Sequence, residues 1–181
     1  MSLDSNRNKG DSYFVNAAFL LQSRGFAHLN CSIFSRALYE AIGGMDESIR
    51  YENDRDVYIR SIDTAKVILF STRYSSRHNI PDISRKENMS TVGTNVDKKL
   101  YQLRVYDKGI CLCTRPAVVR SCRLGKTYEL KHLAQILAHE RQFKRALHYA
   151  REALLNGFNF RWSGYCLYLS FRSAITHRSV H

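Results

Sequence analysis

The chain has 181 residues, 44% of them hydrophobic, so it can bury one sizeable core or two small ones, and disorder along its whole length is excluded. Its longest apolar runs, such as Tyr165–Leu169, fall far below the about 20 residues that a membrane-spanning helix requires. The polar first residues lack the apolar core of a signal peptide, and we therefore expect a cytoplasmic protein.

The net charge of +12 is unevenly distributed. Residues 101–181 hold 14 Lys and Arg against 4 Asp and Glu, whereas residues 1–100 hold 14 against 12. Such a basic tail suits peripheral contact with an anionic membrane at its inner face, with nucleic acid or with a phosphorylated acceptor. A solvated helical surface with a basic bias explains it equally well. Tyr165, Tyr168 and Phe171 have the spacing of a helix core, which argues against nucleic acid.

Five cysteines, an odd number, fit reduced thiols better than a disulfide framework. Cys111 and Cys113 lie close to Cys122, but the Cys-x-x-Cys spacing and a fourth ligand of a zinc site are missing. We therefore predict no zinc site at these thiols.

The N-terminal segment contains short apolar runs after a polar start. Residues 1–10 are polar, and we expect them to be disordered. The apolar residues within Tyr13–Leu21 predict a short helix that ends near Gly25. Residues Phe26–Phe34 partly alternate between apolar and polar, as a strand does.

The next segment predicts a helix, a loop, a second helix and a strand. Ser35 can cap a helix over Arg36–Ile42, which stops at two glycines. Apolar positions predict a further helix over Asp54–Ala65, and Lys66–Phe70 has the composition of a buried strand. This order indicates an α/β arrangement over residues 11–92.

The second half of the chain has a different character. Residues 93–99 indicate a linker or the start of a helix, and residues 100–119 mix apolar and basic residues without a clean period. We therefore expect a linker and an irregular segment over residues 93–127. Residues 128–176 predict a helical hairpin and a third helix, Trp162–Ala174, and we expect the hairpin to pack on this helix or on a partner. Within the hairpin, Arg141–Leu154 resembles the second half of a tetratricopeptide repeat, a unit that cannot cover its own apolar faces.

The segment with the strongest functional signal joins a glycine pair to closely spaced acids. Adjacent glycines allow left-handed backbone dihedrals, which can direct a carboxylate into a cleft. The glycines and the acids that follow them are Gly43, Gly44, Asp46, Glu47, Glu52, Asp54 and Asp56.

The run Gly43–Arg60 resembles the acceptor-side motif of family 2 glycosyltransferases, which have the GT-A fold. In that motif a Gly-Gly-Phe-Asp-Glu turn is followed by Glu-Asp-x-Asp and, four residues past the second Asp, by an Arg. Met45 stands in for the Phe, and Asn53 for the Glu. A second segment, Ser76–Thr91, is similar to the same enzymes, so the resemblance covers about residues 11–91.

The resemblance implies a partial GT-A fold that lacks the N-terminal nucleotide-binding half, followed by a helical extension. The strands and the Asp-x-Asp that hold metal and diphosphate in the family should precede residue 11, and the chain has neither there. The run Asp54–Asp56 has the letters of that motif but lies in the acceptor half. We therefore expect an incomplete catalytic domain, with a second chain as one source of the donor half.

The resemblance also assigns roles to the acids. It implies that Asp54 is the catalytic base of an inverting transfer and takes the proton of the acceptor hydroxyl. Asp56 would then position Asp54 or the acceptor, and Arg55 would offset part of the charge. The residues that the resemblance places at the acceptor are Gly43, Gly44, Asp46, Glu47 and Arg60.

The donor side depends on two residues of the second segment. The resemblance implies that Arg77 and His78 contact the donor diphosphate and that His78 also binds a divalent metal, Mn2+ or Mg2+. The donor would be a nucleotide-sugar, and the acceptor a glycan of the bacterial surface type, a glycolipid or a protein. A polar loop surface is the alternative for both residues.

Two alternatives stand beside this assignment. The acids Glu52, Asp54 and Asp56 also suit the first turn of a helix, where the macrodipole favours negative charge. The whole chain also suits a non-catalytic binding or scaffold protein whose basic helical tail contacts a polyanionic partner or a membrane surface. Salt-sensitive binding to polyanions that survives Asp54→Asn would favour the scaffold.

Overall fold

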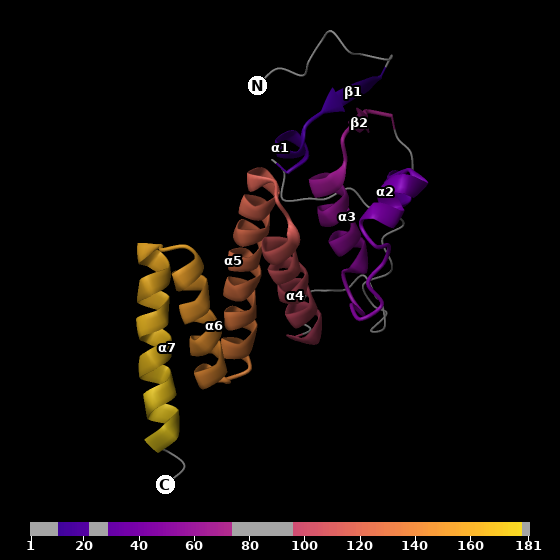
Figure 1. Cartoon of the computed structure of the whole chain (residues 1–181). Coiled ribbons are helices and arrows are strands. Elements are labelled where there is room, and N and C mark those ends of the chain that lie inside the picture. The colour runs from indigo at the N-terminus through magenta and orange to yellow at the C-terminus, as the bar shows by residue number, and fades with distance from the viewer. Residues whose placement is uncertain (1–10, 22–28, 74–95, 179–181) are drawn as a thin grey trace.

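The computed structural model describes residues 11–21, 29–73 and 96–178, which are mostly helical and contain one small sheet (Figure 1). The elements in chain order are β1 (Ser12–Val15), α1 (Ala17–Leu20), a 3-10 turn (Leu29–Cys31), α2 (Arg36–Ala41), α3 (Asn53–Thr64), β2 (Ile68–Ser71), α4 (Val96–Leu112), α5 (Pro116–His139), α6 (Phe143–Asn156) and α7 (Phe160–Arg178). The expected mixture of helix and strand is present, but helices dominate it.

The sheet has two antiparallel strands, β1 and β2, in a register that pairs Ser12 with Ser71. Strand β1 occupies part of the segment that we expected to be helical. The Asn16 side chain accepts a hydrogen bond of 2.9 Å from the Phe19 N–H, and only from that cap onward does the chain turn into the short helix α1. The β-branched and aromatic residues before the cap suit a strand instead.

Two other strand predictions also need correction. The strand expected near residues 66–70 is confirmed as β2, but it is largely exposed rather than buried, and Leu69 is 53% exposed. The strand expected over residues 26–34 is wrong where the structure describes it. There the Ser32 N–H donates to the Leu29 carbonyl at 3.0 Å and closes a 3-10 turn.

Helices α2 and α3 confirm the predictions for the segment that carries the acids. The Ser35 hydroxyl caps α2 by accepting from the Leu38 N–H at 3.2 Å. After α2 the chain passes through Gly43 and Gly44, whose φ angles are +76° and +68°. Helix α3 then begins at Asn53 and runs for 12 residues.

The expectation of irregular structure over residues 93–127 is wrong, because α4 and α5 occupy most of that segment. Helix α4 buries Lys98, Lys99 and Gln102 together with its apolar residues, so polar letters occupy positions that face the core and hide the helical period. Helix α5 starts with Pro116 in its first turn, where the missing N–H costs no hydrogen bond. Its start therefore lies well before the expected one.

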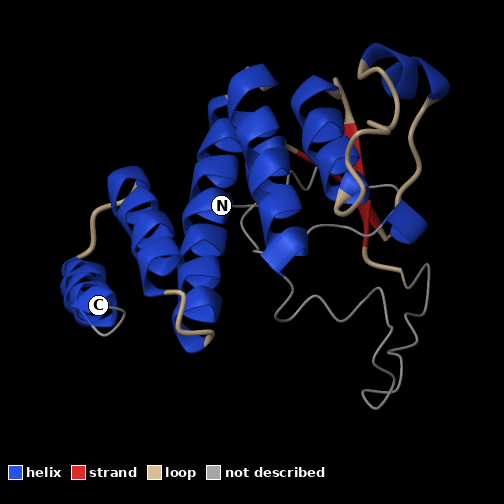
Figure 2. Ribbon diagram, turned by 90° about the horizontal axis from the view of Figure 1, so that it is seen from below, coloured by secondary structure: helices blue, strands red, loops and turns tan. Residues whose placement is uncertain are grey.

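Two buried clusters hold the helices together, and α4 and α5 contribute to both. One cluster joins α4, α5, α6 and α7 around Leu130, Leu133 and Leu137, which are fully buried. The other joins α1, α3, α4 and α5 around residues such as Ile62 and Val118. Figure 2 shows α4 to α7 side by side, with α3 and the sheet beyond α4.

The predicted hairpin and its packing on a third helix are confirmed. Helix α6 packs between α5 and α7 through small residues such as Ala146 and Ala150, which are fully buried. The Trp162 indole of α7 donates to the Ala150 carbonyl at 3.0 Å. Among the helices that the structure describes, none has both the length and the apolar character to cross a bilayer.

Candidate functional site

The glycine turn is shaped by Tyr39 of α2. A Cβ on Gly44 would lie 3.3 Å from the Tyr39 ring, and the positive φ angle of this residue also favours glycine. The Tyr39 hydroxyl accepts a hydrogen bond of 3.2 Å from the Met45 N–H. The turn is thus held against α2 before the chain reaches the first acid, Asp46.

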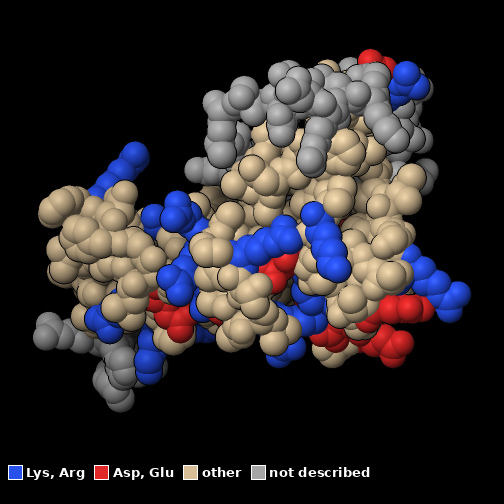
Figure 3. Space-filling view, turned by 45° about the horizontal axis from the view of Figure 1, so that its top comes forward, with Lys and Arg blue, Asp and Glu red and all other residues tan. Residues whose placement is uncertain are grey.

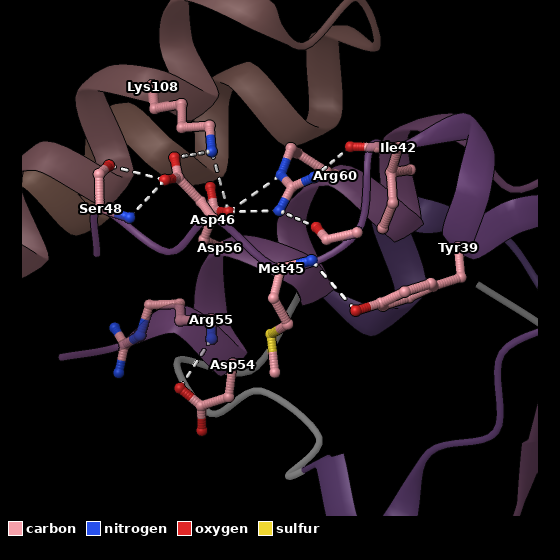
Figure 4. Close-up of polar contacts among 11 residues, drawn as sticks. Tyr39, Ile42, Met45, Asp46, Ser48, Asp54, Arg55, Asp56, Arg60 and Lys108 are labelled. Atoms are coloured by element: carbon pink, nitrogen blue, oxygen red, sulfur yellow. Dashed lines mark hydrogen bonds and ion pairs between the residues drawn. The ribbon is translucent and has the colours of Figure 1, made fainter. Parts of the chain in front are cut away.

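Beside the turn lies a cluster of two carboxylates and two cations, which we call the ion cluster: Asp46, Asp56, Arg60 and Lys108 (Figure 4). Asp56 is 2% exposed and accepts from Arg60 Nε at 3.0 Å through Oδ2. Lys108 Nζ donates to the same oxygen at 3.0 Å and to Asp46 Oδ2 at 2.6 Å. Each carboxylate therefore meets a cation, and the formal charges of the cluster cancel.

Arg60 also fixes the backbone of the glycine turn. Its guanidinium donates to the Ile42 carbonyl and, at 2.8 Å, to the Gly44 carbonyl. Because an arginine has several donors in one rigid plane, it can bind Asp56 and both carbonyls at once. Arg60 therefore ties α3 to the turn that follows α2.

Asp46 is fixed from three sides. It accepts hydrogen bonds from the Ser48 N–H at 3.0 Å and the Ser48 hydroxyl at 2.6 Å, in addition to the bond from Lys108. These bonds, that from Lys108 above all, hold the pKa of Asp46 well below its usual value. The carboxylate thus stays ionised over the pH range in which an ordinary aspartate becomes protonated.

Asp54 lies apart from the ion cluster. Figure 4 shows its carboxylate directed away from Asp56 and Lys108, although it belongs to the same helical turn. It is half-buried, and within the described part of the chain its carboxylate accepts one hydrogen bond, of 2.8 Å from the Arg55 N–H, and forms no ion pair. Asp54 therefore retains oxygen lone pairs that another molecule can use.

The residue before α3 is held in an uncommon conformation. Glu52 has a φ angle of +66°, in the left-handed region that non-glycine residues seldom adopt. Its carboxylate accepts from Gln102 Nε2 of α4 at 3.0 Å and pairs with Arg55 Nε at 2.8 Å. Arg55 in turn donates to the Tyr106 hydroxyl, so the start of α3 is anchored on α4.

The structure brings together some of the residues that the sequence singled out. Gly44, Asp46, Asp56 and Arg60 lie in one bonded group, whereas Glu47 is exposed and no bond joins it to that group within the described residues. Gly43 is exposed in the turn. The expected donor-side residues Arg77 and His78 lie outside the described residues, as does the expected disordered segment 1–10.

Lys108 belongs to the ion cluster, although the sequence analysis did not single it out. It is 52 residues from Asp56 and 62 from Asp46 along the chain, in a segment that we expected to be irregular. No local sequence pattern distinguishes Lys108 from the other lysines of the chain. The one nearby feature is Gly109, the next residue of α4, which packs closely against its neighbours.

The described acids do not fit a divalent metal. Within residues 11–21, 29–73 and 96–178, no group of three or more His, Cys, Asp or Glu side chains is placed to hold one. Asp46 and Asp56 each accept a hydrogen bond from Lys108 through an oxygen that a metal would need as a ligand. The Lys108 ammonium group therefore already lies between the two carboxylates.

No protein-family model, curated protein or solved structure matches this chain. The features of the chain that bear on its function are therefore its sequence pattern and the geometry of the ion cluster and Asp54.

Proposed function

We propose that the chain is the acceptor-side part of an inverting glycosyltransferase with the GT-A fold, with Asp54 as its catalytic base. The observation that supports this proposal is the contrast between three neighbouring acids. Asp46 and Asp56 are matched by cations, while the Asp54 carboxylate is directed away from them and keeps free lone pairs among the described residues. A general base needs that combination of a fixed backbone and an available oxygen.

In the proposed reaction, an Asp54 oxygen takes the proton of the acceptor hydroxyl while the hydroxyl oxygen attacks the anomeric carbon of the donor sugar. The bond between that carbon and the diphosphate oxygen breaks, and the nucleoside diphosphate leaves with the bonding electrons. A single displacement inverts the anomeric configuration. Asp56, Arg60 and Lys108 act as positioning residues, because they fix the first turn of α3 and the glycine turn beside it.

The donor side of the proposal follows the resemblance of the sequence. It assigns the nucleotide-sugar diphosphate and its Mn2+ or Mg2+ ion to Arg77 and His78. The nucleotide-binding half would come from another polypeptide, and the acceptor would be a glycan, a glycolipid or a protein. The proposal places this reaction in the cytoplasm.

Sugar transfer tests the role of Asp54. The assay follows labelled sugar from uridine and guanosine diphosphate donors to a panel of glycan and lipid acceptors. Asp54→Asn keeps the shape of the side chain but removes the base, and we expect turnover to fall by about 10²-fold to 10⁴-fold with the fold intact. Asp97→Asn is the matched control, because Asp97 is an exposed acid in the first turn of another helix, α4. Equal turnover in the two variants would contradict the role of Asp54 as catalytic base. Asp54 would then only favour the start of helix α3.

Calorimetric titration with uridine and guanosine diphosphates, with and without manganese, tests the donor side. We expect metal-dependent binding that His78→Ala weakens. No binding at millimolar nucleotide would mean that the chain alone is either an incomplete enzyme or a non-catalytic binding protein. Absence of sugar transfer also when the polypeptide with the donor half is added would contradict the proposal and favour the binding protein.

A further inference from the structure

Helix α7 carries an exposed apolar stripe on the side that faces away from α6. Its large side chains and their exposed fractions are Phe160 85%, Leu167 72%, Tyr168 48%, Phe171 66% and Ile175 46%. Phe160, Leu167, Phe171 and Ile175 recur at steps of seven or four residues, and Tyr168 lies next to Leu167, so all five lie on one side of the helix. The opposite face packs into the core through Cys166 and Leu169. A continuous exposed stripe of this kind marks a contact surface.

Cations border this stripe on both sides. Arg161 and Arg172 are exposed on α7 itself, next to the apolar residues. The Arg172 guanidinium lies over the ring of Phe143 in α6, 4.7 Å from its centroid, and over that of Tyr168, so Arg161 is the cation that we assign to an occupant. On the other side, a groove of about 750 Å³ separates α7 from α6, and Lys144 and Arg151 of α6 line it. Figure 3 shows blue Lys and Arg side chains around uncharged surface on the left side of the molecule, where these two helices lie.

Carboxylates are scarce around the stripe. Helix α7 has no Asp or Glu in its 19 residues. The groove contains Glu152, which faces His148 of the same helix at 3.5 Å. An occupant of this surface must therefore offer both an apolar layer and negative charge, and a second copy of α7 would instead bring arginines against arginines.

We propose that α7 docks on the surface of a bilayer that contains anionic lipids. A helix of 19 residues is about 28 Å long and can lie in the plane of the membrane, with Phe160, Leu167 and Phe171 at the boundary between headgroups and acyl chains. Arg161 then faces anionic headgroups, and Lys144 and Arg151 add attraction from α6. Tyr168 suits this boundary, because its ring is apolar and its hydroxyl can reach water. The inference does not depend on the proposed sugar transfer.

Sedimentation with vesicles tests the docking. The purified full chain is mixed with phosphatidylcholine vesicles and with vesicles that also contain about one-third phosphatidylglycerol. We expect at least tenfold tighter binding to the anionic vesicles, and a loss of that preference as salt shortens the Debye length from about 10 Å to about 3 Å. Leu167→Ser/Phe171→Ser should weaken the binding at least tenfold.

The matched control is Val67→Ser/Leu124→Ser. It removes two apolar side chains that are 67% and 68% exposed but lie outside α7. We expect this variant to bind vesicles as the wild type does, and circular dichroism should show unchanged helix content in both double variants. Four results would overturn the proposal: no binding to anionic vesicles, equal binding to neutral ones, equal loss in both variants, or a dimer by light scattering that Leu167→Ser/Phe171→Ser dissociates. The last would identify the stripe as a self-association face, and recovery of an acidic helical partner without vesicle binding would identify it as a protein-binding one.

Discussion

Replacing Arg60 by Met should destabilise the fold strongly, because it removes a cation from a buried pair. Asp56 is 2% exposed and would keep only Lys108, while the Ile42 and Gly44 carbonyls would lose a donor. Breaking a buried ion pair lowers the free energy of unfolding by about 3–5 kcal/mol. Because Lys108 still pairs with Asp56, we expect a loss at the lower end of this range, about 3 kcal/mol. With a urea m-value of about 2 kcal/mol/M, the unfolding midpoint followed by circular dichroism should fall by roughly 1.5 M.

The chain contains a matched control for this substitution. Arg36 and Glu40 have the same spacing of four residues and a distance of 2.8 Å, but their side chains are 91% and 61% exposed. Arg36→Met should therefore cost no more than about 0.5 kcal/mol. Adding Asp56→Asn to Arg60→Met should recover part of the loss, because it removes the buried charge. Similar midpoints for Arg36→Met and Arg60→Met would refute the reasoning.

Two further predictions concern packing and thiol chemistry. Gly109→Ala should destabilise the chain by about 1–3 kcal/mol in urea unfolding, because the new Cβ would lie 2.6 Å from Cys122 Sγ. Gly164→Ala in α7 should instead stabilise the chain by about 0.5–1 kcal/mol, because its Cβ would meet nothing within 4 Å. Burial raises the pKa of Cys113 to about 12 and that of Cys122 to about 11, so a thiol reagent at pH 8–9 should label the exposed Cys31 and Cys111 before these two. The fold favours the neutral form of these thiols, because it raises their pKa values above those of the unfolded chain. Their contribution to the free energy of unfolding is therefore complete below about pH 8.5 and should be lost as the pH rises toward 11–12. Labelling of Cys113 and Cys122 at the rate of Cys111 would contradict the expectation for the thiols. A change in stability of the same sign for both glycine substitutions would contradict the expectation for packing.

Local signals explain which elements the sequence could predict. The cap at Ser35, the two glycines after α2 and the Leu and Ala repeat of α5 and α6 each act within a few residues, and the structure confirms all three. Strand β1 could not be predicted, because a strand of four residues is too short to be told from a helix start by its pattern of apolar residues. Helix α4 was missed because its core-facing positions include lysines and a glutamine, whose long stems can be buried while their polar ends find partners.

The candidate site divides in the same way. The glycine turn and its acids could be found from the sequence, because they lie within 14 residues of one another, from Gly43 to Asp56. The sequence could not show which of the acids would be neutralised, because that depends on Lys108, which tertiary packing brings to them. The distinction between Asp54 and Asp56, on which the proposed function depends, is thus a property of the folded chain.

The bond from Lys108 to Asp46 spans 62 residues, and this separation has a consequence for how the site is assembled. Closing so long a loop costs conformational entropy before the bond can form, so the turn can gain its final geometry only when α4 docks against α3. A peptide that ends before α4 would contain the whole glycine and acid motif and still leave Asp56 without one of its two cations. The residues of the motif are therefore close together in the sequence, but the geometry of the site depends on a helix that lies far along the chain.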